Sequence, residues 1–263
     1  MAKDQTILFH STIFGPVRSR RLGVSLGVNL LPSDGKVCSF DCIYCEAGYN
    51  AQGPGTTGLP ARADVAALLE TRLRAMAAEG VRPDVITFSG NGEPTLHPDF
   101  AGIMDDTLRL RDALCPAAKV SVLANSTQLH RPDVVEALRR ADNAILKLDS
   151  AVEATMRALD RPASPAFTVE RVVEQLAQFG PQAIVQTMIT RGSHDGARVD
   201  NSTPAEVDAL IEAYRRIRPR EIMLYTIDRR TPEQSLEHVG RDELEAVAAR
   251  ITAATGIEVQ VSA

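Results

Sequence analysis

Apolar residues follow two patterns along the chain. Short, mostly apolar runs, typical of buried parallel strands, occur at residues 25–31, 84–89, 119–124, 143–149, 183–189 and 221–227. Between them apolar residues recur at helical spacing, which predicts helices at 64–79, 99–114, 132–140, 153–159, 168–179 and 203–217. Alternation of strand and helix predicts an α/β fold with a parallel sheet and right-handed crossovers. Six main strands are too few for a closed eight-stranded barrel.

The two ends of the chain lie outside this alternation. Residues 7–14 are apolar enough for a short leading strand or arm, and residues 15–23 form a turn-rich basic segment. A helix at 241–255 and a short strand at 257–261 follow the last main strand. We therefore expect one domain over residues 1–263, divided into an N-terminal arm (1–24), a partial barrel (25–230) and a C-terminal helix and strand (231–263).

Three of the four cysteines stand close together after the first main strand, as Cys38, Cys42 and Cys45. Thiolates are soft ligands, and such a group selects zinc, copper(I) or iron–sulfur. Structural zinc usually takes four protein ligands, and no histidine lies nearby in the sequence to complete the set. A 4Fe–4S cluster held by three cysteines leaves one iron for a small molecule. The spacing therefore favours a 4Fe–4S cluster, with a zinc knuckle as the alternative.

Polar and glycine residues follow the later strands. In α/β folds ligands bind beyond the carboxyl ends of the parallel strands. The segment Ser89–Leu96 follows the second strand; its glycines let the backbone approach a ligand, and Glu93 offers an acceptor for a cation. Lys147 and Asp149 are two positions apart and face the same side of their strand, where they either contact a ligand or substrate or form a structural ion pair. Other candidates near strand ends are Asn125 and Ser126, with turn and cap roles as the alternative, Met188, with core packing as the favoured alternative, and Tyr225.

The cysteine loop, with Tyr44 before its last cysteine, resembles the cluster loop of the radical S-adenosylmethionine (SAM) enzymes. Gly92-Glu93-Pro94 resembles the family's Gly-Gly-Glu motif, with Asn91 in place of its first glycine. The resemblance covers almost the whole chain and implies a partial (β/α)6 TIM-like barrel of the radical SAM type with a short N-terminal arm. It implies one 4Fe–4S cluster on the three cysteines. It also implies a SAM site formed by Tyr44, Asn91, Gly92, Glu93, Asn125, Ser126, Lys147, Asp149 and Met188.

This resemblance also implies a reaction. An external electron donor of the flavodoxin or ferredoxin type reduces the cluster, and SAM is cleaved to a 5′-deoxyadenosyl radical that takes hydrogen from an unidentified substrate. Phe14-Gly15-Pro16-Val17, together with the cysteine loop and the glycine motif, looks like an uncharacterised bacterial branch related to the wyosine-forming tRNA enzymes. The alternatives are an activase that installs a glycyl radical on a partner protein, a tRNA-modifying enzyme, and a non-enzymatic iron–sulfur carrier. This chain lacks the extra cysteines of the wyosine-forming tRNA enzymes, which argues against a tRNA substrate. An iron–sulfur carrier needs no SAM site, so the Gly92-Glu93 motif argues against that alternative.

The composition of the chain favours some classes of substrate and partner over others. Net charge is −5 and no long Lys/Arg-rich run occurs, so a nucleic-acid substrate is less favoured than a small molecule, peptide or protein. No apolar run is long enough to span a membrane, and the first residues lack a signal-peptide pattern. We expect a cytoplasmic protein, where grouped cysteines bind metal rather than form disulfides. Three features are left open: Cys115 as a spectator, residues 46–62 as a lid or linker, and Arg18, Arg20 and Arg21 as anion contacts or solvated side chains.

Overall fold

The strands and helices alternate over most of the computed structural model, which describes residues 7–19 and 23–263. The strands of the main sheet are Ile13–Ser19 (β1), Gly23–Val28 (β2), Val85–Phe88 (β3), Lys119–Ala124 (β4), Asn143–Lys147 (β5), Ala183–Met188 (β6), Glu221–Tyr225 (β9) and Glu258–Ser262 (β10). The α-helices are Arg62–Ala78 (α1), Phe100–Leu114 (α2), Pro132–Arg140 (α3), Glu153–Asp160 (α4), Val169–Ala177 (α5), Pro204–Ile217 (α6) and Arg241–Thr255 (α7).

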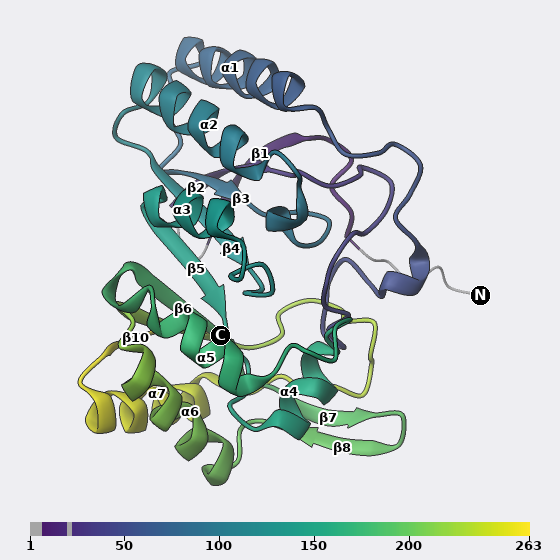
Figure 1. Ribbon diagram of the computed structural model, residues 1–263, viewed down its shortest axis with the longest axis vertical. Coiled ribbons are helices and arrows are strands. Elements are labelled where there is room, and N and C mark those ends of the chain that lie inside the picture. The colour runs from purple at the N-terminus through teal and green to yellow at the C-terminus, as the bar shows by residue number, and fades with distance from the viewer. Residues whose placement is uncertain (1–6, 20–22) are drawn as a thin grey trace.

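Six neighbouring strands, β2, β3, β4, β5, β6 and β9, are parallel and hydrogen-bonded in that order. Within the described chain the sheet stays open: β1 pairs antiparallel on one edge and β10 parallel on the other. Helices α1 to α3 lie along one half of the curved sheet and α5 to α7 along the other (Figure 1). The expected partial (β/α)6 barrel is confirmed.

Burial on both faces of the sheet explains the continuous apolar runs, because parallel strands covered by helices have no water-facing side. A large apolar cluster packs between the sheet and the helices. A second, smaller cluster contains Ile145, Ile184 and Met223, one from each of three neighbouring strands. Since side chains alternate along a strand, this second cluster faces the inside of the barrel. Lys147 is two residues beyond Ile145 and therefore also faces the inside.

The N-terminal edge differs from the prediction. Residues 7–12 form no strand, whereas β1 occupies part of the segment that we expected to be a turn. An irregularity in the pairing between Phe14 and Val17 accommodates Pro16, which an edge strand tolerates because its free side needs no amide donor. The rings of Phe9 and Phe14 stack with their centroids 3.8 Å apart, and this contact holds the residues before β1 against that strand. Arg18 lies in β1, while Arg20 and Arg21 lie outside the described residues.

The polar segment after β6 also differs from the prediction. We expected a loop, but it contains a hairpin of Arg191–His194 (β7) and Ala197–Asp200 (β8). Its two-residue turn, Asp195-Gly196, has positive φ at both positions, the backbone that a tight hairpin needs. None of the described helices is long and apolar enough to cross a bilayer.

Candidate active site

The cysteine loop, residues 36–46, is held on one side by the segment that follows β3. The amide of Val37 donates to the carbonyl of Asn91 (3.0 Å), and the amide of Glu93 donates to the carbonyl of Val37 (3.1 Å). Gly92 lies inside this bridge with φ of 136°, and a Cβ there would stand 1.9 Å from the Val37 carbonyl oxygen. The bridge therefore requires glycine at this position.

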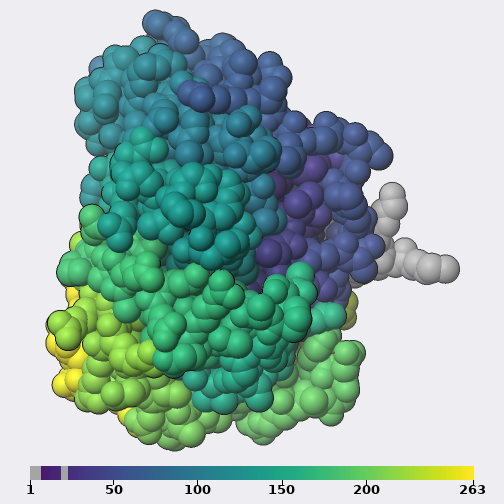
Figure 2. Space-filling view, in the orientation of Figure 1, coloured from purple at the N-terminus to yellow at the C-terminus, as the bar shows by residue number. Residues whose placement is uncertain are grey.

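The end of α4 holds the other side of the cysteine loop. Asp41 donates its amide to the carbonyl of Asp160, and Ile43 donates its amide to the carbonyl of Leu159, both at 3.0 Å. In the space-filling view the purple-to-blue N-terminal third packs directly against the green middle of the chain (Figure 2). Two segments more than 100 residues apart in the sequence thus share hydrogen bonds.

A buried lysine closes the cysteine loop from within. Lys36 is 3% exposed, donates its ammonium to the carbonyl of Gly48 (2.6 Å) and lies 3.8 Å from the carboxylate of Asp41. Asn50 also donates its side-chain amide to the carbonyls of Cys38 and Phe40. The first part of the segment 46–62 is therefore hydrogen-bonded to the cysteine loop, and its role as a lid or a linker stays a prediction.

Three thiols in one short loop make up the soft donor set that an iron–sulfur centre uses, and in the metal-free chain those of Cys38 and Cys42 are held protonated. Burial raises the pKa of Cys38 to about 12 and that of Cys42 well above its usual value, while Lys36 and Lys147 oppose these shifts. The thiol of Cys42 donates to Oδ1 of Asp160 at 3.5 Å. Among the described residues no three His, Cys, Asp or Glu side chains converge on one ion position. A 4Fe–4S cluster does not require such convergence, because each cysteine binds a different iron.

A polar network lies beside these thiols inside the barrel. The ammonium of Lys147 is 2.7 Å from the hydroxyl of Tyr44, 3.2 Å from Oδ2 of Asp149 and 3.3 Å from the hydroxyl of Tyr225. Tyr44 donates its hydroxyl to Asp149 and also lies 3.2 Å from Asp160. Burial, together with the charge of Asp149, raises the pKa of Asp160 well above its usual value. The ammonium thus contacts one carboxylate and two phenols, and a second carboxyl group, that of Asp160, joins the network through Tyr44.

Glu93 joins the glycine motif to the end of β4. It is 2% exposed; its Oε1 accepts from the amide and hydroxyl of Thr95, and its Oε2 accepts from the amide of Asn125 (2.6 Å). Burial raises the pKa of Glu93, and these hydrogen bonds oppose the shift. The side-chain amide of Asn125 lies 3.0 Å from the hydroxyl of Ser39 and 3.6 Å from Sγ of Cys38. Glu93 and Asn125 therefore stand next to the cysteine loop.

Three other residues that we predicted at the SAM site form hydrogen bonds with other parts of the protein. The side chain of Asn91 bonds to the backbone of Phe9 and Pro32. Ser126 has φ of 71° and donates its hydroxyl to the carbonyl of Lys147. Met188 is buried and donates its amide to Asp149 (2.9 Å). Their predicted contacts with SAM stay predictions.

Two residues at the site were not predicted from the sequence. Asp160 ends α4, and nothing near it in the sequence marks it as special, since its role comes from the fold. Lys36 is the first residue of the cysteine loop, two positions before Cys38, and this proximity to a cysteine was a usable signal. Cys115, by contrast, is buried at the end of α2 and belongs to the core.

Comparison with known proteins adds a family. A family model described as the Radical SAM superfamily matches residues 33–190. A Brachyspira hyodysenteriae protein named GTPase Obg is 27% identical over 98% of this chain and 36% of its own length. A Helicobacter pylori UPF0026 protein is 29% identical over 82% of this chain and 66% of its own length. The chain thus spans less than two thirds of these curated relatives.

Solved structures resemble the chain in fold. A radical SAM methyltransferase from Sphaerobacter thermophilus has a TM-score of 0.62 at 14% identity, covering 90% of this chain and 65% of that one. Streptococcus suis SuiB bound to S-adenosylmethionine has a TM-score of 0.63 at 15% identity, covering 90% and 50%. TYW1 with a lysine-pyruvate adduct has a TM-score of 0.57 at 14% identity, covering 87% and 73%.

Proposed function

Since this chain belongs to the radical SAM superfamily, we propose that it is an enzyme that cleaves S-adenosylmethionine reductively and takes a hydrogen atom from a substrate that stays unassigned. The observation that carries this proposal is the bridge between the cysteine loop and Gly92-Glu93. It brings three thiols and a glycine-lined, carboxylate-bearing segment together at the carboxyl ends of neighbouring strands. A carrier of iron–sulfur clusters needs no such second segment.

Cys38, Cys42 and Cys45 would hold one 4Fe–4S cluster. When bound, the cluster supplies one electron that breaks a carbon–sulfur bond of SAM, giving methionine and a 5′-deoxyadenosyl radical. Glu93 provides a fixed acceptor for the amino group of SAM, since its carboxylate is held by Thr95 and Asn125. The fold supplies position and excludes water, as proteins do for cofactor chemistry.

The Lys147 network would set the charge of the inner wall. Burial by itself lowers the pKa of Lys147, but Asp149 and Tyr225 raise it well above its usual value, so the ammonium stays charged. A fixed cation there offsets negative charge on the nearby thiolates or on a bound carboxylate. Tyr44 joins the cysteine loop to this cation through its hydroxyl and its ring, whose centroid lies 5.0 Å from the ammonium.

The proposed enzyme would use an external electron donor of the flavodoxin or ferredoxin type, act in the cytoplasm, and take a small-molecule, peptide or protein substrate. One solved structure, with a TM-score of 0.63 at 15% identity, is of SuiB bound to its precursor peptide SuiA. This likeness supports the fold and leaves the substrate of this chain open. Whether the enzyme acts as an oxidoreductase or a lyase depends on that substrate.

The test is anaerobic. The chain is reconstituted with iron and sulfide, mixed with SAM and a strong reductant, and assayed for 5′-deoxyadenosine by mass spectrometry. We expect the wild type and Cys115→Ala to form it and Cys42→Ala to form none. Cys115→Ala is the matched control, because it removes a buried cysteine away from the site. Equal yields from Cys42→Ala and the wild type would refute the proposal.

A further inference from the structure

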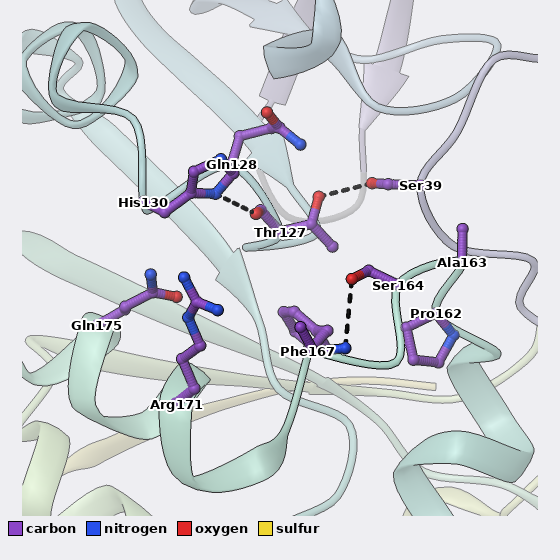
Figure 3. A pocket seen from close by; sticks show the side chains of 11 residues that line it. Ser39, Thr127, Gln128, His130, Pro162, Ala163, Ser164, Phe167, Arg171 and Gln175 are labelled. Atoms are coloured by element: carbon purple, nitrogen blue, oxygen red, sulfur yellow. Dashed lines mark hydrogen bonds between the residues drawn. The ribbon is translucent and has the colours of Figure 1, made fainter.

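A surface groove opens beside the cysteine loop, outside the barrel interior. Its volume is about 280 Å³, and it lies between the residues after β4, the segment after α4, and α5. Figure 3 shows Arg171 and Gln175 projecting from α5 toward His130, with Phe167 along another side and Ser39 at the upper right, bonded to Thr127. The SAM-site candidates Glu93, Lys147 and Asp149 do not line it.

The groove reaches the cysteine loop directly. The hydroxyl of Ser39, the residue after Cys38, is 2.6 Å from the hydroxyl of Thr127, which also lines the groove. The carbonyl of Ser39 accepts a hydrogen bond from the amide of Ala163 (2.9 Å). The side-chain amide of Asn125 contacts both the hydroxyl of Ser39 and Sγ of Cys38. A short path of covalent and hydrogen bonds therefore runs from the groove to a cysteine sulfur.

The charge of the groove contrasts with that of the chain. The net charge of the protein is −5, yet no Asp or Glu lines the groove. Arg171 is exposed, and its guanidinium makes no hydrogen bond or ion pair with any residue that the structure describes. Complementary charge on a partner speeds encounter and fixes orientation, so a free cation at an open groove favours an acidic partner.

On the basis of the proposed function, we propose that this groove docks an acidic one-electron carrier protein with a flavin or iron–sulfur centre. Arg171 would contact a carboxylate of the carrier, and the electron would enter the cysteine loop through Ser39 and Cys38. One electron leaves the reduced centre of the carrier and one is gained by the cluster; no bond is made or broken and no proton moves. The short bonded path to sulfur favours this occupant over a nucleic acid or a small anion.

The experiment compares two reductants on the reconstituted protein. Flavodoxin in its fully reduced form is an acidic protein donor, whereas reduced methyl viologen is a small cation that needs no cationic groove. Stopped-flow absorbance measures the rate of cluster reduction, and calorimetry measures the Kd of flavodoxin for the metal-free chain. The variants are Arg171→Glu and the double variant Arg171→Glu/Gln175→Glu. Both residues line the groove from α5, and neither side chain hydrogen-bonds to another residue in the described part of the chain.

We expect Arg171→Glu to slow reduction by flavodoxin at least about tenfold at low salt, to weaken its Kd in parallel, and to leave reduction by methyl viologen unchanged. The double variant should be slower still, and wild-type rates should fall as salt rises. Arg74→Glu is the matched control, because it makes the same charge change on α1, where Arg74 pairs with Glu70 at 2.7 Å. It should behave as the wild type with both reductants.

Each outcome decides for or against the docking surface. Unchanged flavodoxin rates and Kd in Arg171→Glu overturn the proposal, as do equal losses with both reductants, which would mean that the groove shapes the cysteine loop instead. Selective loss with flavodoxin supports the docking surface, even where no 5′-deoxyadenosine forms, and in that case the proposed reaction fails on its own. If no cluster can be assembled, the proposed function falls, and the calorimetric Kd of flavodoxin for the metal-free chain alone decides the docking surface: an unchanged Kd in Arg171→Glu overturns it.

Discussion

Replacing Lys147 by methionine should destabilise the metal-free chain by about 3–5 kcal/mol at pH 8, because it leaves a buried carboxylate without its cation. Asp149 is 0% exposed, and its Oδ2 lies 3.2 Å from the Lys147 ammonium. Asp149 keeps its other partners: the amide of Met188, the hydroxyl of Tyr44 and the carboxyl group of Asp160, whose pKa is raised. They are dipoles and cannot neutralise the charge, so the loss is larger than that of a single hydrogen bond.

The loss should depend on pH in a defined direction. The charge of Lys147 lowers the pKa of Asp160, which is already raised by burial, so losing Lys147 raises that pKa further. Stability of the Lys147→Met chain relative to the wild type should therefore be higher at pH 5 than at pH 8, since the folded variant holds protons more tightly than the unfolded chain does. The double variant Lys147→Met/Asp149→Asn removes the charge altogether and should recover most of the loss at pH 8.

Urea unfolding followed by far-ultraviolet circular dichroism gives the free energies of unfolding at both pH values. Lys119→Met is the matched control, because Lys119 is exposed at the start of β4, and a change there should stay within about 0.5 kcal/mol. If Lys147→Met is as stable as Lys119→Met at pH 8, the ammonium does not compensate Asp149 and the charge assignment inside the barrel is wrong.

The cysteine loop and its neighbours allow three further tests. Gly92→Ala should lose most of the iron and sulfide bound on reconstitution, because its Cβ would stand 1.9 Å from a loop carbonyl, whereas Gly58→Ala, with positive φ but open space, should keep it; equal loading would contradict this. Since burial raises the pKa of Cys38 from 9.0 to about 12, iodoacetamide at pH 7.5 should label it about a thousandfold more slowly in the folded metal-free chain than in urea, as mass spectrometry can measure. Hydrogen bonds from Thr56 hold the pKa of Asp34 far below its usual value, so the Thr56 amide should stay protected from hydrogen exchange down to pH 3, as NMR can measure, but not in Asp34→Ala.

The main sheet was predictable because its central strands are buried on both faces. Continuous apolar runs then mark each strand, and helical periodicity marks each crossover. The edges lack this signal. Strand β1 contains Pro16 and a basic residue, and the β7–β8 hairpin is polar and partly exposed, so neither has an apolar run. The Asp195-Gly196 pair was the available signal for the hairpin.

Some residues of the candidate site were likewise predictable from the sequence, and others were not. Residues close in sequence, such as the three cysteines, or placed by strand ends, such as Glu93 and Lys147, follow from local pattern and topology. Asp160 does not, because its place beside Cys42 depends on where α4 ends and how that end packs on a loop more than 100 residues earlier. No propensity or spacing encodes such a contact.

The cysteine loop is held by protein atoms, and this bears on what the cluster does for the fold. The loop's backbone is bonded to the segment after β3 and to the end of α4, and Phe40 and Ile43 are buried in the main core at 2% and 0% exposure. Small zinc domains are unfolded without metal because their few apolar residues cannot form a core. Here Cys42 is one member of a large core that is otherwise built almost entirely from aliphatic and aromatic side chains. A bound cluster then stabilises the native state only through its own binding free energy, while the loop geometry that receives it is set in advance by the barrel.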